Sequence, residues 1–245
     1  MDIQKRELLY EGKAKRMWST DNAYELVMEF KDSLTAFDAQ KKGQFSGKGV
    51  INNQASALIM AELASVGIEN SFIRLLDDNH ALVRHVEIIL LEMILRYEAQ
   101  GSICKRYGIA PGLPFDPPLV EFGYKNDELH DPYLTEEIAA AMGLATLEEC
   151  AKLRYMTLAT GEKLRSMFAR QGVRLLDFKL EFGRYKDPAT GKTRIILADE
   201  VTPDTCRLVD IATGAKMDKD LFRFDLGDVE GGYNALLAKL RDGKG

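Results

Sequence analysis

The chain has 245 residues, of which 46% are apolar and 29% charged, a composition that excludes a disordered polymer and indicates a folded globular protein. Its 33 basic and 38 acidic side chains give a formal charge of −5, and its basic residues are scattered, so a general nucleic-acid binder is not expected. The longest strongly apolar run, at residues 88–91, is far shorter than the roughly 20 residues that cross a bilayer. No secretory signal is expected at the N-terminus, and the three cysteines are too widely spaced for a metal motif. These features favour the cytoplasm.

Strands and one helix are predicted in the first 95 residues. Period-two alternation and branched side chains predict strands, in chain order, at 8–10, 16–18, 24–30, 72–76, 81–86 and 87–95. A lysine-rich turn with a glycine joins the first two strands. Apolar residues at three- and four-residue steps predict a helix over 52–66, with Gly67 just after its end. We expect antiparallel pairing between strands 72–76 and 81–86, because only a short polar turn separates them.

The rest of the chain predicts a loop, a long helix, a hairpin and a final helix. Four prolines between residues 111 and 118 predict the loop. Thr146 and Glu149 have the spacing of a capping box, and the helical pattern continues from there until Gly172. A turn at 187–192 predicts a hairpin of strands 175–183 and 194–201, and an amphipathic helix is expected over 233–240.

One strand of the predicted hairpin carries charges on a single face. Period two places Asp177, Lys179 and Glu181 on that face and the apolar residues between them on the other. On the partner strand Asp199 shares a row with apolar residues, where a carboxylate is costly without a cation or donors. A hairpin centred near Thr190 would put Glu181 opposite Asp199, which favours a cation between them, and oxygen ligands favour magnesium over zinc. A solvated face with cross-strand ion pairs is the alternative.

Two further segments have the residue types that bind anions. In Gly12-Lys13-Ala14-Lys15 the glycine lets backbone amides approach a phosphate and two ammonium groups offset its charge, although the spacing is not that of a P-loop and a solvated turn is the alternative. Arg96, followed by Gly101 and Ser102, offers a guanidinium, a hydroxyl and a flexible backbone. Arg207 could join this second set.

Several motifs, in order along almost the whole chain, resemble the SAICAR synthetase (phosphoribosylaminoimidazole-succinocarboxamide synthase) family. They are Tyr10-Glu11-Gly12-Lys13-Ala14-Lys15, Arg96 with Gly101-Ser102, residues 125–127 with His130-Asp131-Pro132, residues 176–183, Ala198-Asp199-Glu200 with Pro203-Asp204, and residues 216–220 with Phe222-Arg223. The resemblance implies an ATP-dependent ligase of de novo purine biosynthesis. Such an enzyme joins L-aspartate to the carboxylate of carboxyaminoimidazole ribonucleotide through an acyl phosphate, and releases SAICAR, ADP and phosphate.

The same resemblance implies roles for individual residues. The ATP site is expected at Lys13, Ala14, Lys15 and the backbone near Ile88, together with Glu181 and Asp199, which would also hold Mg²⁺. The ribonucleotide substrate is expected at Arg96, Ser102 and Arg207. Catalytic positions are expected at Asp38, Lys179, Glu181 and Asp199.

The fold implied by the resemblance is α+β and related to ATP-grasp proteins, with two lobes of mainly antiparallel sheet. The N-terminal lobe would cover residues 1–86 and carry the lysine hairpin, the C-terminal lobe would cover 87–245, and nucleotide would lie in the cleft between them. The family implies a homodimer in the cytoplasm. Four residues depart from the family pattern: Leu90, Tyr97, Gln100 and Val209. The first three leave open a nucleotide-binding sensor without turnover, and a phosphotransferase that stops at substrate phosphorylation is a second alternative.

Overall fold

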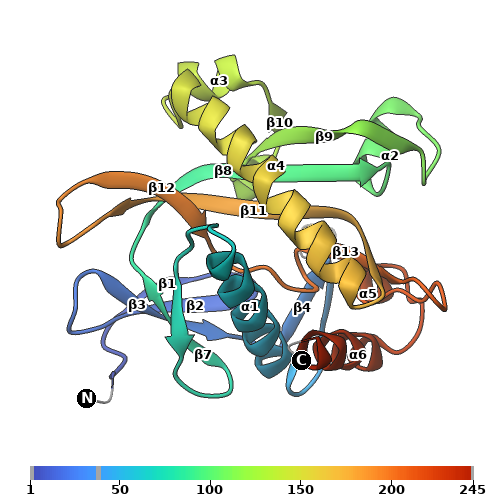
Figure 1. Cartoon of the computed structure of the whole chain (residues 1–245), viewed down its shortest axis with the longest axis horizontal. Coiled ribbons are helices and arrows are strands. Elements are labelled where there is room, and N and C mark those ends of the chain that lie inside the picture. Colours follow the sequence, from blue (N-terminus) through green and yellow to red (C-terminus); the bar gives the residue numbers. More distant parts are fainter. Residues whose placement is uncertain (1–2, 37–39, 244–245) are drawn as a thin grey trace.

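A computed structural model describes residues 3–36 and 40–243, and these form antiparallel sheets with helices packed on them (Figure 1). The first sheet has the order β1-β2-β3-β7-β6. Its strands are β1 (Leu8–Glu11), β2 (Lys15–Ser19), β3 (Glu25–Phe30), β6 (Phe72–Leu75) and β7 (His80–Arg84). The predicted pairing across the turn at 77–79 is confirmed, because β6 and β7 are antiparallel neighbours. A separate hairpin joins β4 (Ser33–Ala36) to β5 (Lys41–Gln44).

The second sheet has the order β10-β9-β8-β11-β12, and β13 pairs with the first half of β11. Its strands are β8 (Glu87–Glu98), β9 (Pro114–Tyr124), β10 (Tyr133–Leu134), β11 (Val173–Lys186), β12 (Thr193–Ala198) and β13 (Cys206–Asp210). The loop predicted at 111–118 is therefore wrong in its second half, since β9 begins at Pro114. Prolines are tolerated there because β10 pairs only with Phe122 and Gly123, so the proline-containing part of β9 is an edge.

Helices cover the sheets at the predicted places, with shifted ends. α1 (Lys48–Ser65) begins one turn before its prediction, and α6 (Val229–Asp242) is longer at both ends. α4 (Leu147–Arg170) has the predicted capping box, in which Glu149 N donates to Thr146 Oγ1 at 3.1 Å and Thr146 N donates to Glu149 Oε2 at 2.9 Å. Short helices are α2 (Ser102–Tyr107), α3 (Glu136–Ala141), α5 (Asp220–Arg223) and a 3₁₀ turn, Asp127–Leu129. Within the described residues, no helix combines the length and apolar character needed to cross a bilayer.

The core lies between α4 and one face of the second sheet, where α4 crosses β8 and β11 (Figure 1). Phe178, Leu180 and Phe182 of β11 are at most 1% exposed, because period two points them all toward this helix. The opposite face of β11 carries the charged residues, as predicted from the alternation. The first sheet meets this sheet at Leu197, whose O accepts from Ser71 N at 2.8 Å and whose N donates to Glu69 O at 3.0 Å.

Candidate functional site

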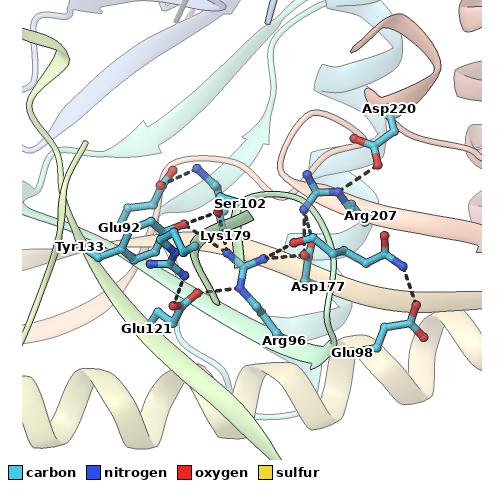
Figure 2. A network of polar contacts seen from close by, with 12 residues as sticks. Glu92, Arg96, Glu98, Ser102, Glu121, Tyr133, Asp177, Lys179, Arg207 and Asp220 are labelled. Atoms are coloured by element: carbon cyan, nitrogen blue, oxygen red, sulfur yellow. Dashed lines mark hydrogen bonds and ion pairs between the residues drawn. The ribbon is translucent and has the colours of Figure 1, made fainter. Parts of the chain in front are cut away.

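Three neighbouring strands place Arg96, Asp177 and Arg207 in one row (Figure 2). The register pairs Asp177 of β11 with Arg96 of β8 on one side and with Arg207 of β13 on the other. Nη1 of each arginine donates to Asp177 Oδ2 at 2.8 Å. Arg96 is only 2% exposed and Asp177 only 4%, so the charges are buried together. The structure thus brings the two predicted anion-binding arginines together around one carboxylate.

The Arg96 guanidinium has further hydrogen-bond partners besides Asp177 (Figure 2). Its Nε donates to Glu121 Oε2 at 2.6 Å, and its Nη2 lies 3.2 Å from Tyr133 OH and 3.4 Å from Ser102 Oγ. The two hydroxyls are themselves 2.8 Å apart. Burial opposes the charged form, but Asp177 and Glu121 raise the pKa of Arg96 above its usual value. The predicted pair of Arg96 and Ser102 is therefore one polar cluster.

Arg207 keeps one guanidinium nitrogen available for a ligand. Its Nε donates to Asp220 Oδ2 at 2.9 Å and its Nη1 to Asp177, whereas its Nη2 donates to no acceptor among the described residues. A Cβ built on Gly101 would lie 2.6 Å from that Nη2, so the absence of a side chain at Gly101 leaves room for the guanidinium. Burial opposes its charge, but Asp177 and Asp220 raise the pKa of Arg207, which stays cationic.

A second group of charges surrounds Glu181, farther along the same face of β11. Lys125 Nζ donates to Glu181 Oε2, and Lys15 Nζ forms ion pairs with both Asp199 and Glu200. Burial, followed by the charge of Asp199, raises the pKa of Glu181 to about 7, while Lys125 and Lys15 oppose that shift. Glu181 and Asp199 therefore lie close enough to repel each other, as the sequence predicted.

The hairpin register differs by one residue from the prediction. Glu181 pairs with Ala198, and the last pair, Lys186 with Thr193, places the hairpin centre between residues 189 and 190. β12 ends at Ala198, and Asp199 has a φ of 58°, in the left-handed region that aspartate tolerates better than most residues. The prediction that Asp199 continues the apolar row of the strand is wrong, because this backbone reversal turns it out of the sheet.

The remaining predicted ligands lie near these two groups. Lys13 Nζ donates to Asp127 Oδ1 at 2.8 Å, so the turn that contains Ala14 reaches the 3₁₀ turn beyond β9. Lys179 Nζ donates to Glu92 Oε2 at 2.6 Å (Figure 2). Along β11, Lys179 lies midway between Asp177 and Glu181.

Ile88 and Asp38 are the last two predicted site positions. Ile88 pairs in register with Gly183, near the start of β8. Asp38 lies outside the described residues.

The departures from the family pattern leave the charged contacts in place. Gln100 bonds to Arg96 through its backbone carbonyl, at 3.2 Å from Nη1, so its side chain does not decide that contact. Leu90 is 44% exposed, and Tyr97 is half-buried with its ring 4.9 Å from the Arg165 guanidinium. Val209 pairs with Arg174 on β13.

Several residues of the two groups were missed by the sequence prediction. Asp177 and Lys125 fall within motifs of the resemblance, but their roles as acceptor and donor depend on strand register. Glu121 has a period-two signal, because Val120 and Phe122 on either side of it are buried. The expected proline loop obscured the strand to which it belongs. Nothing in the local sequence identifies Tyr133 or Glu200 as partners.

Glu181 and Asp199 fit a magnesium ion by their chemistry. Both offer only oxygen, and a divalent cation would offset the repulsion that contributes to the raised pKa of Glu181. Residues 3–36 and 40–243 contain no cluster of three or more histidine, cysteine or acidic side chains arranged for a metal. The protein would thus supply few ligands and leave the others to water and phosphate oxygens, which is the usual pattern for Mg²⁺.

The fold and the site define a mixed α+β protein that collects buried guanidinium groups, lysines and carboxylates on one face of an antiparallel sheet, as expected for a binder of anionic small molecules. A family model described as SAICAR synthetase matches residues 8–240. The chain belongs to the SAICAR synthetase family.

Individual relatives cover nearly the whole chain. The phosphoribosylaminoimidazole-succinocarboxamide synthase of Persephonella marina is 49% identical over 243 residues, which are 99% of this chain and 100% of the relative. A crystal structure of the Ehrlichia chaffeensis synthase has a TM-score of 0.91 at 41% identity and covers 96% of this chain and 98% of that one. A SAICAR synthetase in complex with ADP has a TM-score of 0.89 at 42% identity, with the same coverage. The predicted SAICAR synthetase-like mixture of helices and antiparallel sheets is confirmed.

Proposed function

We propose that the chain is an ATP-dependent ligase that joins L-aspartate to the carboxylate of carboxyaminoimidazole ribonucleotide, giving SAICAR, ADP and phosphate in de novo purine biosynthesis. One observation carries the proposal. In this member of the family, the row of Arg96, Asp177 and Arg207 (the arginine row) and the charges around Glu181 (the Glu181 group) lie on one face of β11. The arginine row would hold the ribonucleotide, chiefly its phosphate, through Arg96, Ser102 and Arg207. Guanidinium groups suit this task because their paired donors match phosphate oxygens.

ATP would bind where the lysine turn of the first sheet meets the acidic residues of the second. Lys15 comes from β2 and already reaches Asp199 and Glu200, so its ammonium would exchange carboxylates for phosphate oxygens when the nucleotide enters. Lys13 and the backbone at Ala14 would contact the phosphates, and the backbone near Ile88 would contact the adenine. The relative in complex with ADP supports the use of a nucleotide. Mg²⁺ at Glu181 and Asp199 would offset the phosphate charge.

The proposed architecture has two lobes that resemble an ATP-grasp protein, residues 1–86 and 87–245, with nucleotide between them. It is supported by the sheets, since β1, β2, β3, β6 and β7 form one and β8 to β13 form the other. The proposal also includes a homodimer in the cytoplasm, on the strength of the family resemblance.

The reaction would proceed in two displacements. The substrate carboxylate oxygen attacks the γ-phosphorus of ATP, the bond to the bridging oxygen breaks, and ADP leaves an acyl phosphate. The amine of L-aspartate then attacks the acyl carbon, phosphate leaves with the bonding electrons, and the nitrogen loses a proton as the amide forms. Lys179, between the arginine row and Glu181, would offset charge on the reacting groups, and Asp38 would orient the incoming amine or the aminoimidazole.

The test measures ADP release with ATP, Mg²⁺ and carboxyaminoimidazole ribonucleotide, with and without L-aspartate, and detects the product by mass. Aspartate-dependent ADP together with the succinocarboxamide is the expected result. ADP release that is independent of aspartate, with no amide product, would replace the ligase by a phosphotransferase. Tight ATP binding with no ADP would replace it by a nucleotide sensor.

A further inference from the structure

Two lysines are anchored on the connection between β12 and β13. Lys219 N donates to Pro203 O at 3.2 Å, and Lys179 N donates to Thr205 O at 2.9 Å. Both side chains therefore start beside the segment 203–205, although the two residues are far apart in sequence. Lys219 directly precedes α5, and Lys179 belongs to the charged face of β11.

The two ammonium groups differ in their partners. Lys179 Nζ donates to Glu92 Oε2 at 2.6 Å. Lys219 is half-buried, and its Nζ has no acceptor among the residues the structure describes. A half-buried ammonium that donates no hydrogen bond is unfavourable, because it has lost part of its water without replacement. Lys219 is thus positioned to donate to an acceptor that residues 3–36 and 40–243 do not supply.

Asp204, the carboxylate whose charge raises the pKa of Lys219, is already occupied by other donors. Asp204 accepts from Lys48 Nζ and Tyr233 OH, each at 2.6 Å, and from Asn52 Nδ2 at 3.2 Å. The Lys48 side chain is 0% exposed and that of Asp204 is 5% exposed, so this arrangement is fixed by the surrounding core. Asp204 therefore cannot turn toward Lys219 without leaving a buried lysine unpaired.

Charged side chains from several elements act on the ammonium group of Lys219. Burial lowers the pKa of Lys219 below its usual value, and the charges of Arg223, Lys48 and Lys179 act in the same direction, whereas Asp204 opposes them. An anion placed beside Lys219 would offset the effect of these cations and stabilise its ammonium group. An anion at this position would also lie near the proposed reacting groups, since Lys179 lies between the arginine row and Glu181 on β11.

We infer that Lys219, together with Lys179, binds a carboxylate group of a substrate. The inference rests on the proposed function, in which L-aspartate and carboxyaminoimidazole ribonucleotide both carry carboxylates to the same place. A carboxylate has two oxygens, so it accepts from both ammonium groups at once and removes the repulsion between them. Lys219 is then a substrate-binding residue that sets specificity for a carboxylate.

The test uses Lys219→Met, which keeps the length of the side chain without its charge, Lys219→Arg, and the control Lys192→Met in the exposed turn of the β11–β12 hairpin. We expect Lys219→Met to raise KM for one of the two carboxylate substrates about 10- to 100-fold, the loss of one hydrogen bond to a charged group. Lys219→Arg should recover part of the loss, and Lys192→Met should match the wild type. A rise for L-aspartate alone assigns its carboxylate to Lys219, and a rise for the ribonucleotide alone assigns the carboxylate of the acceptor.

Unchanged KM values for both substrates in a folded Lys219→Met protein would overturn the inference. If that variant does not fold, as judged by circular dichroism, Lys219→Gln replaces it. A wild-type protein that forms no SAICAR would refute the proposed function instead. In that case calorimetric titration with L-aspartate and with the ribonucleotide still decides the inference. Weaker binding of either one by the variant supports it, and equal binding of both overturns it.

Discussion

Replacing Gly101 with alanine tests whether Arg207 binds the substrate phosphate. Gly101 has φ 65° and ψ −126°, a conformation that other residues avoid at a cost of about 1–3 kcal/mol. An added Cβ would lie 2.6 Å from Arg207 Nη2, the nitrogen that has no acceptor among the described residues. Since Cβ atoms do not approach a neighbour so closely, the guanidinium must move away from the turn that precedes α2.

The expected effect is the loss of one charge-assisted hydrogen bond to phosphate, about 1.5–3 kcal/mol. KM for carboxyaminoimidazole ribonucleotide should therefore rise about 10- to 100-fold, while KM for ATP changes much less. Gly108→Ala is the control for a positive φ without a contact, because Gly108 has φ 64° and ψ 28° and nothing lies within 4 Å of the position of its Cβ. Steady-state kinetics and urea unfolding of both variants separate the contact from the backbone strain.

The reasoning would be refuted by equal KM values for the ribonucleotide in the two variants, accompanied by similar losses of stability. That result would mean that Arg207 is held for structural reasons alone. A fall in kcat for Gly101→Ala with no change in any KM would also contradict a binding role.

Three further predictions concern the charged groups. Lys13→Ala and Asp199→Asn should each lower the rate of ADP release about 10²-fold or more, through lost electrostatic stabilisation, and near-normal rates in folded variants would remove the assigned roles. In metal-free protein the pKa of Glu181, raised to about 7, should make the free energy of unfolding fall as pH rises from about 4.5 to 7. The protonated Glu181 stabilises the fold fully below the pKa that it has in the unfolded chain, and this stabilisation is lost as pH rises through its pKa in the folded protein. Urea unfolding in EDTA should therefore show a free energy of unfolding that depends less on pH for Glu181→Gln than for the wild type. Parallel pH profiles of the two proteins would contradict this. Asp177→Asn should reduce the free energy of unfolding by about 3–5 kcal/mol, because two buried arginines lose their shared carboxylate, and a change below about 1 kcal/mol in urea unfolding would show that they repair it.

Features that depend on local sequence were predicted well. The capping box of Thr146 and Glu149 lies within four residues, and it forms as expected at the start of α4. The face of β11 with Asp177, Lys179 and Glu181 follows from the pleat of a strand alone. The resemblance added the family and its expected ligands, which no local rule supplies.

Features that depend on how distant segments meet were not predicted. The backbone reversal at Asp199 ends β12 at Ala198, whereas periodicity assumes that the strand continues. Asp177 as the common acceptor of Arg96 and Arg207 requires the register of three strands from distant parts of the chain. That Lys219 has no acceptor within the described part of the chain depends on its surroundings in space, so it has no sequence signal.

The strand β11 sets the distance between the proposed binding site for the substrate phosphate and the proposed ATP site. Asp177 and Glu181 are separated by four residues of extended chain, which corresponds to about 14 Å. Inserting one residue between them would send Glu181 to the apolar face under α4, whereas inserting two would keep its face and add about 7 Å. In the proposed site, the distance from substrate phosphate to reacting carboxylate would therefore change only in steps of two strand residues, and a ligand of a different length would not be accommodated by small adjustments of this strand.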